Sequence, residues 1–248
     1  MIQVIRAAER HYTDFDWLKT YWLFSFADYY DPANIQFGAL RVFNDDVVQP
    51  QTGFGTHPHA EMEIITVVLS GEVTHEDSLG NKAVMRAGDV QRMSAGTGIQ
   101  HSEFNLGDVP VHFYQIWIYP DTSGLAPSYD QKSFRGVNRT NRLLPVASGQ
   151  GLPDVVVFHT DATIYISELE AQQTLTHAAD GSRRMFIYVT DGDLEVPGAR
   201  LRTKDQARID PEAPVTLTAQ ADTSFVLIDV PSCRGWGYDQ ATLRGSQR

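Results

Sequence analysis

The sequence is poor in cysteine, in basic residues and in long apolar runs, and each shortage excludes a class of protein. Cys233 is the single cysteine of the 248 residues, so a disulfide within the chain is impossible. No apolar run approaches the roughly 20 residues that a membrane-spanning helix needs. The opening stretch MIQVIRAAERHYTDFDW has charges where a secretory signal needs an apolar centre. We therefore expect a cytoplasmic protein with no membrane partner.

Basic side chains are outnumbered. The chain has 20 Lys and Arg against 31 Asp and Glu, which gives a formal net charge of −11 and a pI of about 5.1. This charge repels a phosphate backbone, and no basic run is longer than Arg183 and Arg184, so the sequence predicts no local basic patch. Direct binding to nucleic acid is not expected. A regulatory role would have to act through a protein partner.

Helical periodicity is also scarce, and alternation with a period of two takes its place. The stretches VHFYQIWIY (111–119) and TSFVLIDV (223–230) are rich in β-branched and aromatic residues, and short turn signals recur between such runs. One short helix is expected at DFDWLKTY (14–21), with Asp14 or Asp16 as its cap. The sequence otherwise predicts an all-β protein.

Two domains are expected, because a polar stretch with Pro and Gly at about 121–153 interrupts the strand pattern. The two halves also share a faint repeat: MRAGDVQRM (85–93) aligns with LRTKDQARI (201–209), and SGEV (70–73) aligns with DGDL (191–194). We expect an N-terminal domain at 1–135 and a C-terminal domain at 136–248.

Two pairs of polar residues carry the chemistry. Side chains at i and i+2 of a strand share a face, so His57 and His59 project together, as do His101 and Glu103. If the two strands face each other inside a barrel, three imidazoles and a carboxylate converge. Such a set suits one divalent transition metal, Fe, Mn, Ni, Cu, Zn or Co, with positions left open. A single H-x-H in a strand is more often incidental than metal-binding. The order of the two pairs along the chain must therefore decide whether they form a metal site.

That order resembles the two motifs of the cupin superfamily. Gly88, Gly96, His101 and Asn105 fit the second motif, with Ser94 in place of its proline and two extra residues before the histidine. The resemblance sharpens in FSFADYYDP (24–32), FGALRVFNDD (37–46), HPHAEMEIITVVLSGEVTHEDSLGN (57–81), GDVQRMSAGTGIQHSEFN (88–105) and YQIWI (114–118), which are similar to the pirin family of bicupins.

The resemblance implies two tandem cupin domains of the jelly-roll type, with His57, His59, His101 and Glu103 binding the metal, most often iron. It also implies that Glu63, the carboxylate of the general cupin motif, is not a ligand. Glu63 nevertheless matches the strand parity of His57 and His59, so it is the first substitute if Glu103 points away. Trp22 and Leu23 replace a His-Thr or similar pair of many relatives. They are expected near the mouth of the pocket.

Bacterial relatives are associated with quercetin 2,3-dioxygenase activity, so the resemblance implies a flavonol-like aromatic substrate and O2, with release of CO. Glu103 is the candidate base and Glu63 the alternative. Two other functions stay open. One is a metal- or redox-sensing regulator that acts through a protein partner, as for pirins of eukaryotes, and the other is a metal-dependent isomerase or hydrolase on the same scaffold.

The second half lacks the ligands. The repeat offsets map the four positions onto Ala178, Asp180, Leu217 and Ala219, so we expect a structural domain that packs its sheet on the first and shields an edge.

The other histidines have no ligand pattern. His177 is interpreted as a surface or loop residue and His112 as facing outward, and His11 and His159 carry no partner pattern in the sequence. His75 either lines the cavity or makes a hydrogen bond at a strand end. The tail from Cys233 either covers the second sheet or extends into solvent.

Overall fold

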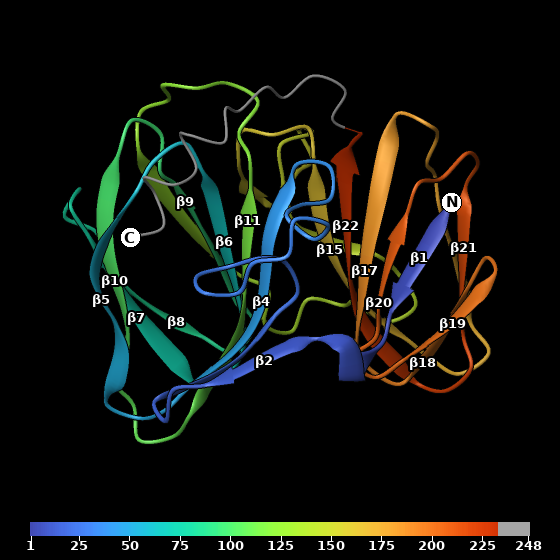
Figure 1. Ribbon diagram of the computed structural model, residues 1–248, viewed down its shortest axis with the longest axis horizontal. Helices are drawn as coiled ribbons and strands as arrows, with labels where there is room; N and C mark the ends of the chain where they lie inside the picture. The colour runs from blue at the N-terminus through green and yellow to red at the C-terminus, as the bar shows by residue number, and fades with distance from the viewer. Residues whose placement is uncertain (233–248) are drawn as a thin grey trace.

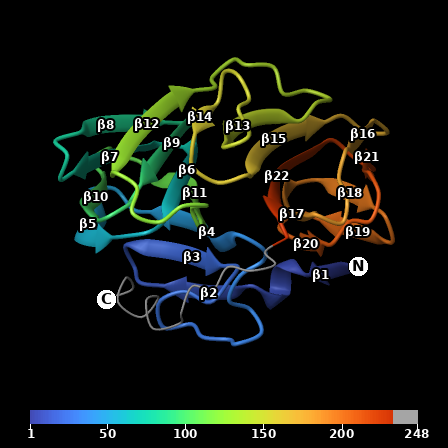
Figure 2. The ribbon, with the colours of Figure 1, turned by 90° about the horizontal axis from the view of Figure 1, so that it is seen from above.

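The computed structural model describes residues 1–232, and these residues form an all-β protein of two domains side by side (Figures 1 and 2). The all-β prediction is confirmed. The one short helical segment in the described residues is a 3-10 turn, η1 (Ala7–Glu9). None of residues 1–232 lies in a helix long and apolar enough to cross a membrane. The tail from Cys233, for which two placements were left open, lies outside the described residues.

The first domain consists of a seven-stranded sheet facing a four-stranded sheet. The larger sheet has the order β12-β9-β6-β11-β4-β3-β2 and the smaller β5-β10-β7-β8. Their bounds are β2 (His11–Asp14), β3 (Leu18–Trp22), β4 (Leu40–Val48), β5 (Thr52–His59), β6 (Glu63–Ser70), β7 (Glu72–Asp77), β8 (Lys82–Arg86), β9 (Asp89–Ser94), β10 (Ile99–Asn105), β11 (Val111–Ile118) and β12 (Ser128–Ser133). Alternate residues of each strand face the space between the sheets, which is the interior of the barrel.

The second domain repeats this plan. Its larger sheet has the order β1-β20-β17-β22-β15-β13-β14 and its smaller sheet β16-β21-β18-β19. Their bounds are β1 (Ile2–Ile5), β13 (Leu144–Ser148), β14 (Val156–Val157), β15 (Thr163–Leu169), β16 (Thr174–His177), β17 (Arg183–Asp191), β18 (Asp193–Val196), β19 (Ala199–Arg202), β20 (Gln206–Ile209), β21 (Val215–Ala219) and β22 (Thr223–Pro231). The order β20-β17-β22-β15 matches β9-β6-β11-β4, so the faint sequence repeat reflects two copies of one fold.

One strand departs from the predicted domain limits. β1 lies in the larger sheet of the second domain, where Ile2 to Ile5 pair with β20. It takes there the place that β12 takes beside β9 in the first domain. The first residues of the chain therefore complete the second sheet, although the sequence assigned all of 1–135 to the first domain.

The two larger sheets pack face to face and bury one continuous apolar core between the domains. Phe43 of β4 lies 5.2 Å from Phe186 and 5.0 Å from Tyr188, measured between ring centroids. Tyr114 and Ile228 belong to the same buried cluster. The expected packing of the second sheet on the first is thus present. This shared core holds the first barrel against a rigid support.

The predicted helix at 14–21 is wrong. The chain leaves β2 at Asp14, bends at Asp16, whose φ is 65°, and enters β3 at Leu18. The Asp14 side chain accepts the backbone N–H of Asp16 and so forms a local turn instead of a helix cap. Leu18, Thr20 and Trp22 are buried, which is a period of two.

Candidate metal centre

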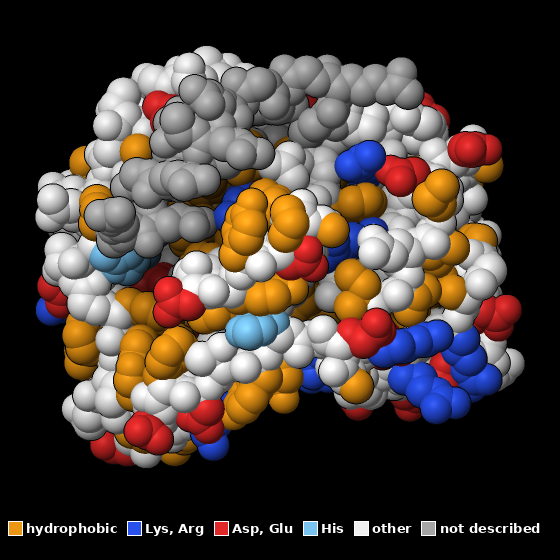
Figure 3. Space-filling model, in the orientation of Figure 1, with side chains coloured by type: hydrophobic (Ala, Val, Ile, Leu, Met, Phe, Trp, Pro, Cys, Tyr) orange, Lys and Arg blue, Asp and Glu red, His pale blue; other side chains and the backbone are white. Residues whose placement is uncertain are grey.

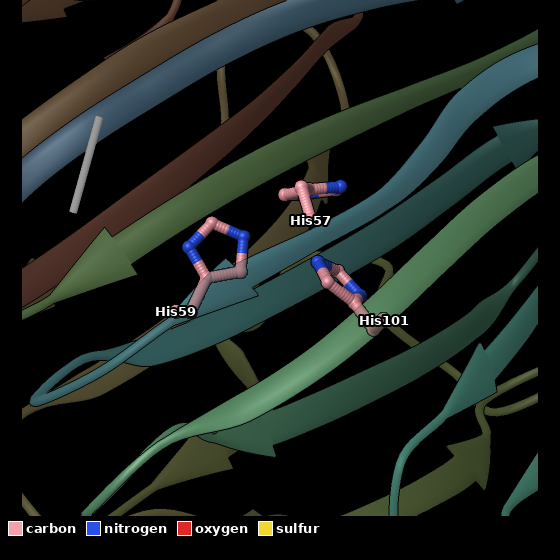
Figure 4. A group of neighbouring side chains, drawn as sticks. All are labelled: His57, His59 and His101. Carbon is pink, nitrogen blue, oxygen red and sulfur yellow. The ribbon is translucent and has the colours of Figure 1, made fainter. Parts of the chain in front are cut away.

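Strands β5 and β10 bring three histidines together. The strands are antiparallel and pair His57 with His101 and His59 with Ile99. His57 and His59 project from the same face of β5, as their spacing predicts, and both rings face the ring of His101 (Figure 4). The three ring centroids are 4.5 to 4.9 Å apart. One nitrogen from each ring lies within 4.8 Å of the other two, so the three side chains could hold one metal ion.

The hydrogen bonds leave nitrogen lone pairs free for such an ion. His57 Nδ1 lies 2.7 Å from the carbonyl oxygen of Gly55, which can only accept, so the ring proton is on Nδ1 and Nε2 keeps its lone pair. Within residues 1–232, the buried atoms His59 Nδ1 and His101 Nε2 have no hydrogen-bond partner. A buried polar atom without a partner costs about 1–3 kcal/mol. A metal ion would satisfy this donor set.

Burial also keeps two of the rings uncharged. Burial, with a smaller contribution from the neighbouring imidazoles, lowers the pKa of His59 to about 2 and that of His101 to about 3. Neutral imidazole is the form that binds a metal, because the protonated ring has no free lone pair. At neutral pH, the two rings need lose no proton before they bind.

Glu103 lies on β10 two residues beyond His101, and its carboxylate is 2% exposed. The pairing of β10 with β5 shifts between His101 and Glu103, so this residue stands opposite Phe54. Its side chain groups with His101 and His75, within the same 4.8 Å limit, and lines the same pocket as His57 and His59. Glu103 thus lies within 4.8 Å of the ligand atoms of His101 and His75, and it shares the pocket, but not that group, with His57 and His59.

Two glutamine amides fix the plane of the Glu103 carboxylate. Gln91 Nε2 donates to Oε1 at 2.8 Å and Gln115 Nε2 donates to Oε2 at 2.7 Å. Trp117 Nε1 in turn donates to the amide oxygen of Gln115 at 3.3 Å. Neither glutamine belongs to a sequence motif, and the only signal for them is inward parity on β9 and β11. A buried carboxylate held at both oxygens keeps its orientation when a ligand enters.

A second buried carboxyl group lies deeper in the barrel. Asp46 of β4 is 2% exposed, and burial raises its pKa to about 8, with further contributions from Asp45 and Glu103. At neutral pH it is therefore protonated. The interior of the first barrel thus carries a polar layer between two apolar clusters.

The prediction that Glu63 shares the face of His57 and His59 is wrong. Glu63 opens β6, in the opposite sheet, and its oxygens contact Ser94 Oγ at 2.7 Å and His159 Nδ1 at 3.0 Å. The parity count fails because the chain leaves β5 after His59 and turns through Glu61, whose φ is 52°. Glu63 therefore faces the second domain and is not available as a substitute for Glu103.

The cluster opens into a pocket of about 340 Å³ with aromatic walls. Trp17, Phe26, Phe54 and Trp117 line it together with His57, His59, Glu103 and Gln115. Most of the other aromatic residues of this domain are core residues. Trp22 is 4% exposed and reaches the pocket only through Phe26, at 5.5 Å between ring centroids, and Leu23 belongs to the core between the domains. Neither residue lines the pocket.

The remaining histidines have partners that sequence spacing cannot reveal. His75 is fully buried and bonds Asp77, so the hydrogen-bonded alternative holds. His112 faces out of the barrel, as predicted, and its Nε2 contacts Asp45 of the neighbouring strand β4 at 2.5 Å. His11 stacks on Tyr29 with ring centroids 4.2 Å apart, and His159 contacts Glu63, from which it is separated by 96 residues.

The described part of the second domain contains no cluster of side chains that could hold a metal. Leu217 and Ala219 are buried in its apolar core, and Asp180 is exposed and bonds Ser182. His177 lies at the end of strand β16 instead of in a loop, and its Nε2 contacts Asp229 at 2.7 Å. Its partner Asp229 also pairs with Arg183, at 2.7 Å.

Folding also produces a basic patch that the sequence did not predict. Arg6, Arg200 and Arg202 meet at one corner, beside β18 and β19, where blue side chains gather in Figure 3. They come from opposite ends of the chain, so a search for basic runs cannot find them. Arg6 pairs with Asp205 and Arg200 with Asp193, which neutralises much of the charge.

The chain is similar to known proteins over nearly its whole length. The family model Pirin matches residues 4–118, and the model for the quercetinase C-terminal cupin domain matches residues 145–230. A pirin-like protein of Caulobacter vibrioides is 46% identical over 87% of this chain and 94% of its own length. A quercetin 2,3-dioxygenase of Escherichia coli K12 is 41% identical over 93% of this chain and 99% of its own length.

Solved structures agree with this similarity. The crystal structure of YhhW from Escherichia coli matches with a TM-score of 0.89 and 39% identity, over 95% of this chain and 100% of that one. A structure described as bacterial pirin YhhW in complex with nickel(II) has the same TM-score and 40% identity, over 94% and 100% of the two chains.

Proposed function

This chain belongs to the pirin family, and we propose that it is a metal-dependent dioxygenase that opens the ring of flavonols such as quercetin with O2 and releases CO. The observation that carries the proposal is a pocket lined by His57, His59, Glu103 and four aromatic side chains, with His101 in ligand distance of both other histidines. Relatives that match over nearly the whole chain include proteins named quercetin 2,3-dioxygenase.

In this proposal His57, His59, His101 and Glu103 are the metal ligands. The three nitrogens have free lone pairs, and the carboxylate is held by two amides. Nitrogen and oxygen donors of this kind accept several divalent metals, so availability selects among them. We propose Fe(II) as the native ion, while the nickel(II) complex of the bacterial pirin YhhW supports Ni(II) as a substitute.

The aromatic walls suit a flat substrate. Trp17, Phe26, Phe54 and Trp117 offer apolar faces on which aromatic rings can stack, and they exclude water from the end of the pocket. When bound, a divalent metal supplies an open position and positive charge for a deprotonated flavonol oxygen. Glu103 is the carboxylate that lines the same space, and in this proposal it accepts the flavonol hydroxyl proton. Gln91 and Gln115 hold its carboxylate toward that proton.

The test is oxidation of quercetin by the metal-loaded protein. The purified chain is loaded with Fe(II) or Ni(II), its metal content is measured, and loss of flavonol absorbance is followed with O2 uptake and CO release. We expect about one metal per chain and equal amounts of O2 consumed and CO formed. His57→Ala and His101→Ala should lose both metal and activity. Glu103→Gln should lower kcat by about 10²–10⁴-fold, which is the usual contribution of a general base.

A control variant in the second domain separates site effects from folding effects. His177→Ala also removes a histidine that contacts an aspartate, but it lies outside the pocket. It should keep its metal and its turnover. A protein that binds metal fully yet leaves quercetin and O2 unchanged would contradict the enzymatic proposal.

A further inference from the structure

Behind His101 a line of buried side chains runs away from the pocket. His101 Nδ1 lies 3.4 Å from His75 Nδ1, and His75 Nε2 lies 3.0 Å from Asp77 Oδ2. His75 is 0% exposed and His101 is 1% exposed, so water does not compete for these contacts. The other nitrogen of His101, Nε2, is the buried atom without a partner. The ring thus has one nitrogen toward His75 and one left free.

Strand pairing produces this line. β7 and β10 are antiparallel and pair His101 with Asp77 and Glu103 with His75. Side chains two residues apart on a strand share a face, so His75 and Asp77 both project on the side of His101 and Glu103. Tyr129 of β12 stacks on the His75 ring, with centroids 4.6 Å apart and planes at 25°, and covers its outer face.

The carboxylate of Asp77, at the end of this line away from the pocket, determines which ring nitrogens of His75 and His101 carry the protons. The carboxylate of Asp77 accepts from Asn81 and from the backbone N–H of Leu79, and these contacts fix its orientation. Asp77 Oδ2 can only accept from His75, so the ring proton of His75 is on Nε2 and its Nδ1 offers a lone pair. His101 must then donate from Nδ1. Its Nε2 is left with a lone pair, which is the form that a metal requires.

We propose that His75 and Asp77 are positioning residues, which hold His101 in the tautomer and the orientation that present its Nε2 to the metal. This inference rests on the proposed metal site. The usual cost of removing such an outer partner is about 10–100-fold in metal affinity. His75, His101 and Glu103 could also form a separate metal site, and the number of bound ions distinguishes that arrangement from the proposed one.

The test measures Ni(II) affinity by competition with a coloured chelator, at fixed pH, on the full chain. His75→Leu removes the acceptor and should lower the affinity about 10–100-fold. His75→Asn places an amide oxygen near the position of Nδ1 and should stay within about threefold of the parent, since the donated hydrogen bond survives. Cu(II)-loaded His75→Leu should also show an altered hyperfine splitting in electron paramagnetic resonance, because the His101 ring is no longer held. His177→Leu, which breaks a histidine–aspartate contact in the second domain, should leave the affinity unchanged.

Several outcomes overturn the inference. The inference is wrong if the parent and His75→Leu bind Ni(II) with equal affinity. It is also wrong if His75→Leu and His75→Asn lose the same amount of Ni(II) affinity. Two metal ions in the parent and one in His75→Leu would mean that His75 is itself a ligand. If His75→Leu does not fold, His75→Gln replaces it, because the longer amide reaches Asp77 instead of His101. In that case, His75→Gln must bind Ni(II) at least tenfold more weakly than His75→Asn does. A parent that binds no metal would instead contradict the proposed function.

Discussion

At the scale of single residues, burial determines the charge of the histidine cluster, and pH can reveal it. The pKa of His59 is lowered to about 2 in the folded protein, mainly by burial, and its ordinary value is 6.5. The unfolded chain therefore binds a proton below pH 6.5 that the folded chain does not bind. Because only the unfolded chain binds this proton, the His59 imidazole lowers the free energy of unfolding as the pH falls from 6.5 toward 2. The reduction is about 2 kcal/mol at pH 5.

His59→Gln should remove this pH dependence. We expect the difference in unfolding free energy between pH 7.5 and pH 5 to shrink by about 2 kcal/mol in the metal-free variant, whatever the variant's absolute stability. Urea unfolding of chelator-treated protein at the two pH values measures the difference. Exposed Tyr12→Phe, in a different part of the domain, should leave the difference unchanged. If the difference in unfolding free energy between the two pH values is as large in His59→Gln as in the parent, then the His59 ring of the parent is protonated in the folded protein.

Sequence could predict that His57 and His59 share a face because strand parity is a local property, whereas their meeting with His101 depends on the pairing of β5 with β10 and was expected from the motif resemblance. It failed for Glu63 because parity was counted across a turn that ends one strand and begins another in the opposite sheet. It also missed Gln91 and Gln115, which are ordinary inward-facing residues until the barrel closes around Glu103. That these residues serve a metal stays a prediction.

At the scale of elements, the pairing of β5 with β10 is what aligns the cluster, and one glycine permits it. A Cβ on Gly53 would lie 2.3 Å from the carbonyl oxygen of Glu103 and 2.5 Å from the Cα of Phe104. Both atoms are backbone, so the strands would have to separate where Glu103 begins to face the pocket. Gly55, two residues along the same strand, has nothing within 4 Å of the corresponding position.

Gly53→Ala should therefore damage the site and Gly55→Ala should not. We expect Gly53→Ala to lose about 1–3 kcal/mol of stability, which is typical of forced overpacking, and to bind metal more weakly. Gly55→Ala should stay within about 0.5 kcal/mol of the parent and bind metal normally. Thermal unfolding with and without Ni(II) measures both effects. Equal behaviour of the two variants would contradict the close approach of β5 and β10.

The strands themselves were predictable, because alternation of apolar residues is read directly from the sequence. The segment 14–21 shows the limit. Asp14 and Asp16 are typical helix caps, but here they form a turn, and the alternation of Leu18, Thr20 and Trp22 against β4 prevails. Contacts with a neighbouring strand decide between the two structures, and a short segment does not contain that information.

At the scale of the whole molecule, one buried carboxylate ties the domains together. Asp45 of β4 accepts the hydroxyl of Tyr188 at 2.6 Å and pairs with Lys204 at 3.1 Å, both from the second domain, and with His112 from its own sheet. Tyr188 is 143 residues away in sequence and lies in none of the motifs that carry the resemblance, although Asp45 lies in the block 37–46. The repeat predicted two domains, but only the folded chain reveals which polar groups lie within the apolar core that joins them.

The ion pairs around Asp45 make the junction sensitive to acid. Burial alone would raise the pKa of Asp45, but the hydrogen bond with His112 and the charge of Lys204 outweigh burial and lower it to about 2. A carboxylate with a lowered pKa stabilises the fold fully above its ordinary value near 3.8, and this contribution is lost as the pH falls from about 4 to 2. The contribution is about 2 kcal/mol.

Asp45→Asn should remove that acid sensitivity and loosen the junction at neutral pH. The amide cannot pair with Lys204, whose side chain is 26% exposed, or with the buried guanidinium of Arg10, 3.7 Å away, so a buried cation loses a partner. We expect a loss of about 3 kcal/mol at pH 7. Calorimetry should resolve separate unfolding of the two domains, because the polar contact that couples them is gone. Asp193→Asn breaks a pair with half-exposed Arg200 and should cost less than about 1 kcal/mol. A single, unshifted transition in Asp45→Asn would show that the apolar core alone couples the domains.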